Sequence, residues 1–350
     1  DVRHWPSARQ NQICAEAWLP ELDEQFGFTG EATLAVRVQL AEWTSAAGDV
    51  EEALTQYVRL LGDLQRVLGK QHPLALRVRR NVAACTGQSG DAAGALKLFE
   101  QLQPDMAKAL GAEHPDTLAI RSEIANWTAE SGDGSQAIVL FQNLLEDQER
   151  LLGRDHLATL QTRNNLILWK GNSGFESEAI RLSRNLLPDH ERLFGRDHPT
   201  TLLARDNLIF WTGEKGDSQN ALRMAKELLS DYERVLGPDH PDTLTLRSKI
   251  AFWTGGTGDS NSALSLFEQL RPDLERVLGR LHPDALAVRN SITFWMGVTG
   301  DAAGALAVAR ELIRDCQRTL GAEHATTVTL ERLVANLEQL ERISGPKEPT

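Results

Sequence analysis

The sequence predicts an all-α solenoid in which pairs of helices stack one after another. Three observations predict it: a period of 42 residues without insertion or deletion, helical spacing of apolar residues in both halves of each repeat, and the lack of strand signals. An uninterrupted period of this length is typical of stacked repeats. One glycine marks the period at Gly27, Gly69, Gly111, Gly153, Gly195, Gly237, Gly279 and Gly321.

The first half of each repeat predicts a helix, designated helix A, that begins at a His-Pro pair such as His72-Pro73. Proline suits the first helical position because its missing N–H would have no partner there. Leu40, Trp43 and Ala47 share one face of such a helix. The aromatic column recurs at Trp43, Trp127, Trp169, Trp211, Trp253 and Trp295, with Cys85 in the remaining repeat.

The second half predicts a helix B that follows a Gly-Asp pair such as Gly48-Asp49. Glycine can adopt the positive φ that ends helix A, and the aspartate side chain can cap helix B. Tyr57 and Leu60 share the apolar face of this helix. An unbroken alanine column lies four residues after the aspartate position, at Ala53, Ala95, Ala137, Ala179, Ala221, Ala263 and Ala305.

The Gly-Asp pair with alanine four residues on, and the segment Val235-Leu-Gly-Pro-Asp-His-Pro-Asp-Thr-Leu-Thr-Leu-Arg247, resemble the tetratricopeptide repeat. The closer resemblance is to its 42-residue form in kinesin light chain and many bacterial regulators. It implies a right-handed superhelix of helix-turn-helix repeats whose A helices line a concave, partner-binding groove. The Phe210-Trp-Thr-Gly variant resembles repeats from actinobacterial proteins that pair such arrays with a nucleotide-binding switch or kinase domain.

The period predicts one array over residues 1–350, because a solenoid grows without needing a new core. It comprises a half repeat over 1–27, seven full repeats over 28–321, and a C-terminal capping helix and tail over 322–350. Since the chain opens at Asp1 inside a predicted helix, we expect a fragment of a longer protein or a processed one. An upstream nucleotide-binding or kinase domain would fit this start.

Prolines interrupt every second B helix, at Pro20, Pro104, Pro188 and Pro272. A proline inside a helix removes one backbone hydrogen bond and clashes with the preceding turn. We therefore expect alternate B helices to kink or restart.

Composition narrows the class of partner. A net charge of −12 disfavours nucleic acid as the main partner. The sequence has no apolar run of membrane-spanning length. The three cysteines fall in unrelated columns, which favours a reducing compartment and hence the cytoplasm.

No group of residues in the sequence predicts catalysis, a cofactor or a metal. The repeated histidines suit the start of helix A better than a metal site, because stacked repeats hold equivalent atoms about 10 Å apart. Asp63 and Arg66 have the spacing of an ion pair on one helix. Cys85 lies in the buried aromatic column, where a packed thiol is expected. We expect a protein that is not an enzyme.

Residues that vary between repeats on the groove side of helix A are the candidates for recognition. Phe210, Phe252 and Phe294 would form an apolar stripe, which on a soluble protein marks a binding surface. The glycines at Gly171, Gly213, Gly255 and Gly297, one turn on, would leave room for a ligand backbone. Alternatively, the phenylalanines pack between neighbouring A helices and the glycines loosen a helix end. The full set of expected partner-binding residues is Arg80, Asn81, Asn164, Asn165, Leu168, Asn207, Phe210, Lys249, Phe252, Asn290 and Phe294.

These features predict a non-catalytic module that binds a peptide or protein segment in the groove. Asparagines would hold the peptide backbone, because their amides both donate and accept hydrogen bonds. The module would be the recognition arm of a larger regulatory protein. The alternative is a self-assembling scaffold, a homo-oligomer or filament built by end-to-end stacking of the half repeats.

Overall fold

The computed structural model describes residues 5–319, 321, 327–332, 334 and 335, which contain fifteen bounded helices and no strand. The helices form two compact units, Asp1–Phe175 and Glu176–Thr350. Unit 1 contains α1 (Trp5–Phe26), α2 (Glu31–Ala46), α3 (Val50–Val67), α4 (Pro73–Gln88), α5 (Ala92–Leu110), α6 (Pro115–Glu130), α7 (Gly134–Leu151) and α8 (Leu157–Asn172). Unit 2 contains α9 (Glu176–Phe194), α10 (Pro199–Glu214), α11 (Ser218–Val235), α12 (Pro241–Gly256), α13 (Ser260–Leu278), α14 (Pro283–Thr299) and α15 (Ala302–Thr319).

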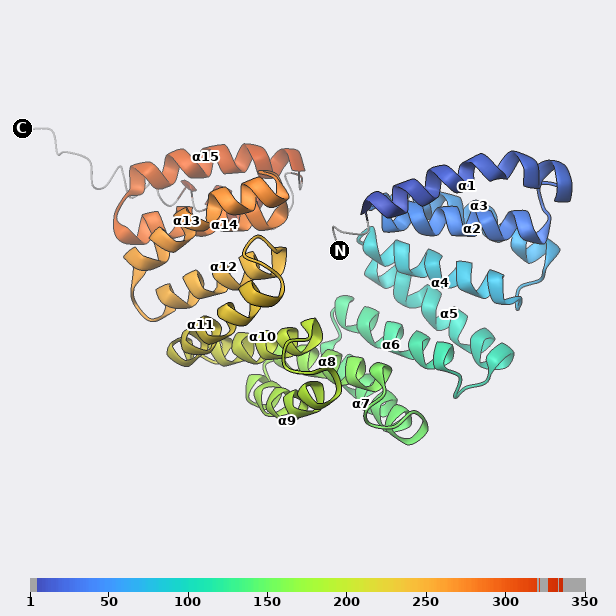
Figure 1. The fold of residues 1–350 in the computed structure, drawn as a ribbon, viewed down its shortest axis with the longest axis horizontal. Helices are drawn as coiled ribbons and strands as arrows, with labels where there is room; N and C mark the ends of the chain where they lie inside the picture. Colours follow the sequence, from blue (N-terminus) through green and yellow to red (C-terminus); the bar gives the residue numbers. More distant parts are fainter. Residues whose placement is uncertain (1–4, 320, 322–326, 333, 336–350) are drawn as a thin grey trace, which may run out of the picture. The chain divides into compact units, whose positions relative to one another are not determined.

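Within each unit the helices alternate between two layers, the even-numbered A helices and the odd-numbered B helices (Figure 1). Each helix packs against the helices before and after it in the unit. Neighbouring A helices also touch directly, at α2 with α4, α6 with α8, and α12 with α14. The predicted all-α repeat solenoid is thereby confirmed, while a single array over residues 1–350 stays a prediction.

The two turn types of each repeat are built as the sequence predicts. In six A helices the N-cap histidine accepts a hydrogen bond on Nδ1 from the backbone N–H two residues on, as from Leu74 to His72 at 3.3 Å. Aspartates cap B helices, as Asp259 does by accepting from the N–H of Ser262 at 3.1 Å. The glycine before that aspartate, Gly258, has a φ of +96°, which glycine alone adopts without strain.

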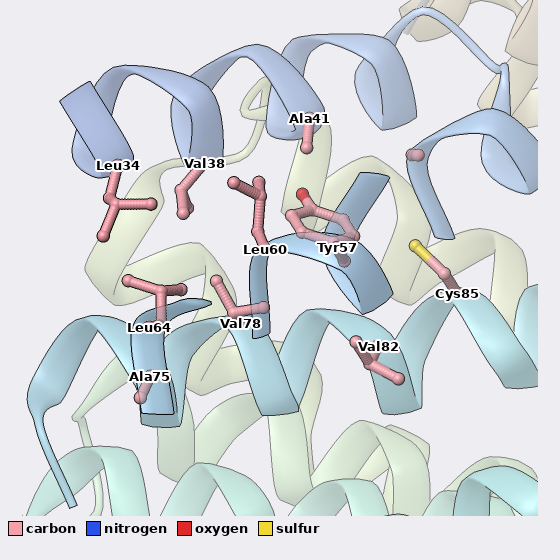
Figure 2. Packing of buried hydrophobic residues seen from close by; sticks show 11 residues of the cluster. Leu34, Val38, Ala41, Tyr57, Leu60, Leu64, Ala75, Val78, Val82 and Cys85 are labelled. Atoms are coloured by element: carbon pink, nitrogen blue, oxygen red, sulfur yellow. The ribbon is translucent and has the colours of Figure 1, made fainter. Parts of the chain in front are cut away.

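The core repeats the same arrangement, with one B helix between two A helices. Figure 2 shows Tyr57, Leu60 and Leu64 of α3 between side chains of α2 and of α4. All seven alanines of the alanine column are fully buried. A larger side chain there would hold the helices apart, so alanine allows them to pack closely. The residues of these recurring columns therefore pack the helices of each repeat against one another.

The prolines do not divide their helices. Each of α1, α5, α9 and α13 runs without a break through its proline, so the expected restart is wrong, while a kink at the proline stays a prediction. Pro20, Pro104, Pro188 and Pro272 are all exposed. On the solvent side a carbonyl freed by the missing N–H can bond to water, which limits the cost to one hydrogen bond.

Candidate partner-binding surface

Three phenylalanines, Phe210, Phe252 and Phe294, occupy the same position on α10, α12 and α14, and are called the phenylalanine row below. Phe252 is 49% exposed and Phe294 50%, whereas Phe210 is partly buried. Each ring stands edge-on to the tryptophan that follows it, with centroids 4.8, 4.8 and 5.0 Å apart. This geometry is favourable for aromatic pairs, so it holds the rings in place while their outer sides remain in solvent.

Two further apolar side chains extend this surface. Leu203 of α10 is 54% exposed and Val298 of α14 is 52% exposed. Leu203 precedes Phe210 by seven residues and Val298 follows Phe294 by four, so each shares a helix face with its phenylalanine. Neither residue was predicted from the sequence, although this spacing is visible in it.

The glycines of the same helices have a structural role. A Cβ on Gly213 would lie 2.4 Å from the Trp253 ring, and one on Gly255 would lie 2.1 Å from the Trp295 ring. The tryptophans of α12 and α14 thus fill the space above the glycine of the preceding A helix. The expectation that Gly213 and Gly255 leave room for a ligand backbone is wrong, because the next repeat takes that room.

An ion pair joins α10 to α12 beside the row. Lys249 Nζ donates to Asp206 Oδ2 at 2.6 Å and lies 5.7 Å from the centre of the Phe210 ring. Asp206 is buried, and its Oδ1 atom has no hydrogen-bond partner among the described residues. A buried carboxylate with one partner depends strongly on that partner, so Lys249 is committed to holding the two helices together.

Asn81 is likewise engaged within the protein. Its amide donates to Glu42 Oε1 at 3.2 Å, across from α4 to α2. Glu42 also accepts from Arg77 at 3.0 Å. Hence these positions on unit 1 form a polar network between A helices.

The remaining candidates divide between the units. In unit 1, Arg80 and Leu168 are exposed, and Asn164 and Asn165 are partly buried. In unit 2, Asn207 and Asn290 are partly buried, and their amides make no hydrogen bond to any other described residue. Asn207 precedes Phe210 by three residues and Asn290 precedes Phe294 by four, so each shares a helix face with its phenylalanine, and Lys249 lies beside Phe210.

The other chemical groups weighed in the sequence have structural partners. Arg276 contacts Asp273 at 3.0 Å on the same helix and Asp239 at 2.7 Å. The Cys85 thiol is 3% exposed, and burial raises its pKa, which opposes nucleophilic use. No group of three histidine, cysteine, aspartate or glutamate side chains in the described part of the chain could hold a metal ion.

Two cavities lie elsewhere, at the edges between helices of both layers. One of about 340 Å³ in unit 1 is lined by Phe28, Arg37 and Asp63, among others. One of about 280 Å³ in unit 2 is lined by Arg205 and Asp231, which pair at 3.2 Å. Neither includes a residue of the phenylalanine row.

Among the helices of the described residues, none has both the length and the apolar character of a membrane-spanning segment.

Comparison with known proteins places these repeats in a family. Residues 32–104 match one tetratricopeptide repeat family, and residues 117–158 and 201–242 match another of the same description. No curated protein sequence matches the chain.

Solved structures give the same answer for the fold. The chain is 25% identical to a Podosopora anserina protein described as a kinesin light chain with nearly identical TPR-like repeats, with a TM-score of 0.51 over 59% of this chain and 98% of that one. It is 13% identical to a Pyrococcus horikoshii signal transduction ATPase with numerous domains and a tetratricopeptide repeat sensor, with a TM-score of 0.55 over 97% and 50% of the respective chains. A Rap protein complexed with competence and sporulation factor is 8% identical, with a TM-score of 0.53 over 97% and 99%.

Tetratricopeptide repeats generally mediate contacts between proteins, and their fold is typically non-catalytic. The 42-residue period, the Gly-Asp turns, the alternating helix layers and these matches agree. The chain is a tetratricopeptide repeat protein with repeats of the kinesin light chain-like type.

Proposed function

We propose that the chain is a non-catalytic recognition module that binds a peptide or protein segment along the A layer of unit 2. The observation that carries the proposal is the phenylalanine row, two of whose rings are half exposed. Burial of a phenylalanine side chain gains about 1.5–3 kcal/mol, so leaving two of them in water favours a partner that covers them.

The rest of the surface suits recognition by contact. The Trp–Gly packing and the Lys249–Asp206 pair fix the A helices beneath the row. A rigid base lowers the entropy lost on binding, because few side chains have to be ordered. The free amides of Asn207 and Asn290 would supply hydrogen bonds to a partner's backbone.

The module would serve as the recognition arm of a longer regulatory protein in the cytoplasm. The similarity to the Pyrococcus horikoshii protein with a tetratricopeptide repeat sensor supports this arrangement at the level of the fold. Under this proposal, partner capture by the repeats would be signalled to a nucleotide-binding or kinase domain in the same polypeptide.

A peptide selection tests the binding proposal. Peptides selected from a displayed random library against the whole chain should bind the Val139→Ala variant as tightly as the wild type, because Val139 is an exposed side chain of α7 far from the row in sequence. They should lose about 2 kcal/mol of affinity, about 30-fold, in Phe252→Ala. Selected peptides that bind Phe252→Ala unchanged would remove the row from the proposed function.

A further inference from the structure

The phenylalanine row repeats at the distance between neighbouring A helices. Packed helices lie about 8–10 Å apart. The contacts that set this step in unit 2 are the Trp253 ring on Gly213, the Trp295 ring on Gly255, and the 2.6 Å pair of Lys249 with Asp206. A ligand that contacts all three rings must therefore present a side chain on one face about every 8–10 Å.

Few backbone conformations have that repeat. A β-strand presents the same face every two residues, about 6.6 Å, which is too short, and every four residues, about 13 Å, which is too long. A polyproline II helix presents the same face every three residues, about 9.3 Å. An α-helix presents it every seven residues, about 10.5 Å.

The polar groups beside the row favour polyproline II over an α-helix. The amides of Asn207 and Asn290 have no partner among the described residues, and no hydrogen bond from the Ser248 hydroxyl is present there either. A polyproline II backbone has no internal hydrogen bonds, so its carbonyls can pair with these groups. The backbone of an α-helix is already paired, so such a ligand would cover these groups and leave them unsatisfied.

The charge around the row specifies the ligand further. The Lys249 ammonium, which lies beside the Phe210 ring, is neutralised by Asp206 at 2.6 Å. Of the exposed acidic groups on these helices, Asp242 and Asp284 lie in the first turns, and Glu214 lies one turn beyond Phe210, at the edge of the surface and at the position that Val298 holds on α14. An uncharged segment therefore matches the centre of the surface, since a charged one would lose hydration without gaining an opposite charge.

We infer that the ligand is an uncharged segment in the polyproline II conformation, with an apolar residue such as proline at every third position. It would cross α10, α12 and α14 with one such residue on each ring. This inference rests on the proposed function and specifies the chemistry of the partner. A segment of seven residues suffices, because six steps of about 3.1 Å span two helix-to-helix distances.

Three labelled peptides test the inference by fluorescence anisotropy with the whole chain. The first has three consecutive Pro-Ala-Gln triplets. The second has the same composition with its prolines two and four residues apart, and the third is an uncharged α-helical peptide with leucine at every seventh position. We expect the first to bind about tenfold more tightly than either of the others, to lose about tenfold or more in Phe252→Ala, and to keep its affinity in Val139→Ala.

The outcomes separate this inference from the proposed function. Equal binding of the first two peptides, or tighter binding of the helical one, would overturn polyproline II recognition. If the peptides bind in that way and still lose affinity in Phe252→Ala, the proposed recognition module holds and only polyproline II recognition is wrong. If none of the three peptides binds and library selection also yields no peptide sensitive to Phe252→Ala, both are wrong.

Discussion

The A layers of the two units are built from the same kind of helix and differ in the side chains that they expose. In unit 1 the column that holds the row contains Glu42, Ala84, Asn126 and Leu168, and Glu42 is bound to Arg77 and Asn81. In α10, α12 and α14 of unit 2 the same column contains Phe210, Phe252 and Phe294. Asn126 also accepts from the Trp169 indole N–H at 3.4 Å, whereas the Trp253 N–H has no partner among the described residues because Phe210 replaces the asparagine. Two of the four unit 1 positions, Glu42 and Asn126, thus bond to the next A helix, whereas Phe252 and Phe294 in unit 2 expose apolar rings.

The largest expected effect comes from removing the ion pair under the row. Lys249→Met leaves the Asp206 carboxylate buried without a partner and should lower the free energy of unfolding by about 3 kcal/mol, measured by urea denaturation. The double variant Asp206→Val/Lys249→Met should recover most of this loss, because Val38 is fully buried at the position of Asp206 in the first repeat. A double variant as unstable as the single one would show that the pair has no special role.

Phe252→Ala should weaken peptide binding by about 2 kcal/mol without loss of helix content. The comparison sharpens when Leu168→Ala is measured beside it, since Leu168 holds the same column in unit 1 and is 44% exposed. We expect little change in Leu168→Ala, as measured by anisotropy with a selected peptide and by far-ultraviolet circular dichroism. Equal losses in the two variants would extend the binding surface to unit 1.

Gly255→Ala should destabilise the protein by about 1–2 kcal/mol, because overpacking against Trp295 outweighs the better helix propensity of alanine. Gly62→Ala is the control, since a Cβ there meets nothing within 4 Å and should stabilise α3 by about 0.5–1 kcal/mol. Thermal unfolding of both variants measures the difference. Stabilisation by both would mean that the tryptophan yields freely and does not set the helix spacing.

The smallest effect concerns Glu123 on the A layer of unit 1. Burial raises the pKa of this carboxyl above its usual value, so the folded protein binds the proton more tightly than the unfolded chain does. Its burial cost is present at neutral pH and is relieved as the pH falls through the raised pKa. Glu123→Gln should therefore stabilise the protein at pH 7 and make no difference near pH 4. A gain that is the same at both pH values would exclude a cost of ionisation.

The period predicted the fold almost completely, because each column recurs too often to be accidental. α1 lies within the predicted half repeat over 1–27, and residues 327–332, 334 and 335 of the predicted capping helix and tail over 322–350 are helical, while the predicted tail lies outside the described residues. What the columns could not show is which of them meet across neighbouring helices. Gly255 and Trp295 are 40 residues apart, and Asp206 and Lys249 are 43 apart. These pairs became evident only from the contacts.

The candidate surface was also predicted only in part, because the sequence columns do not show which side chains meet across neighbouring helices. The exposure of Phe252 and Phe294 follows from their place on the face of helix A away from the core. The engagement of Asn81 and Lys249 depends on Glu42 and Asp206 of the preceding A helix, and Phe210 is half covered in the same neighbourhood. Variation between repeats thus identified positions that are free to differ, but some of these residues, such as Asn81 and Lys249, form bonds between neighbouring helices.

Hydroxyl-radical footprinting read by mass spectrometry, with and without a saturating selected peptide, tests the central claim most directly. Phe28 and Phe175 of unit 1, 60% and 52% exposed, are internal controls for Phe252 and Phe294. We predict that the peptide protects Phe252 and Phe294 from oxidation and leaves Phe28 and Phe175 unchanged. Protection of the unit 1 phenylalanines with continued oxidation of Phe252 and Phe294 would contradict recognition by unit 2.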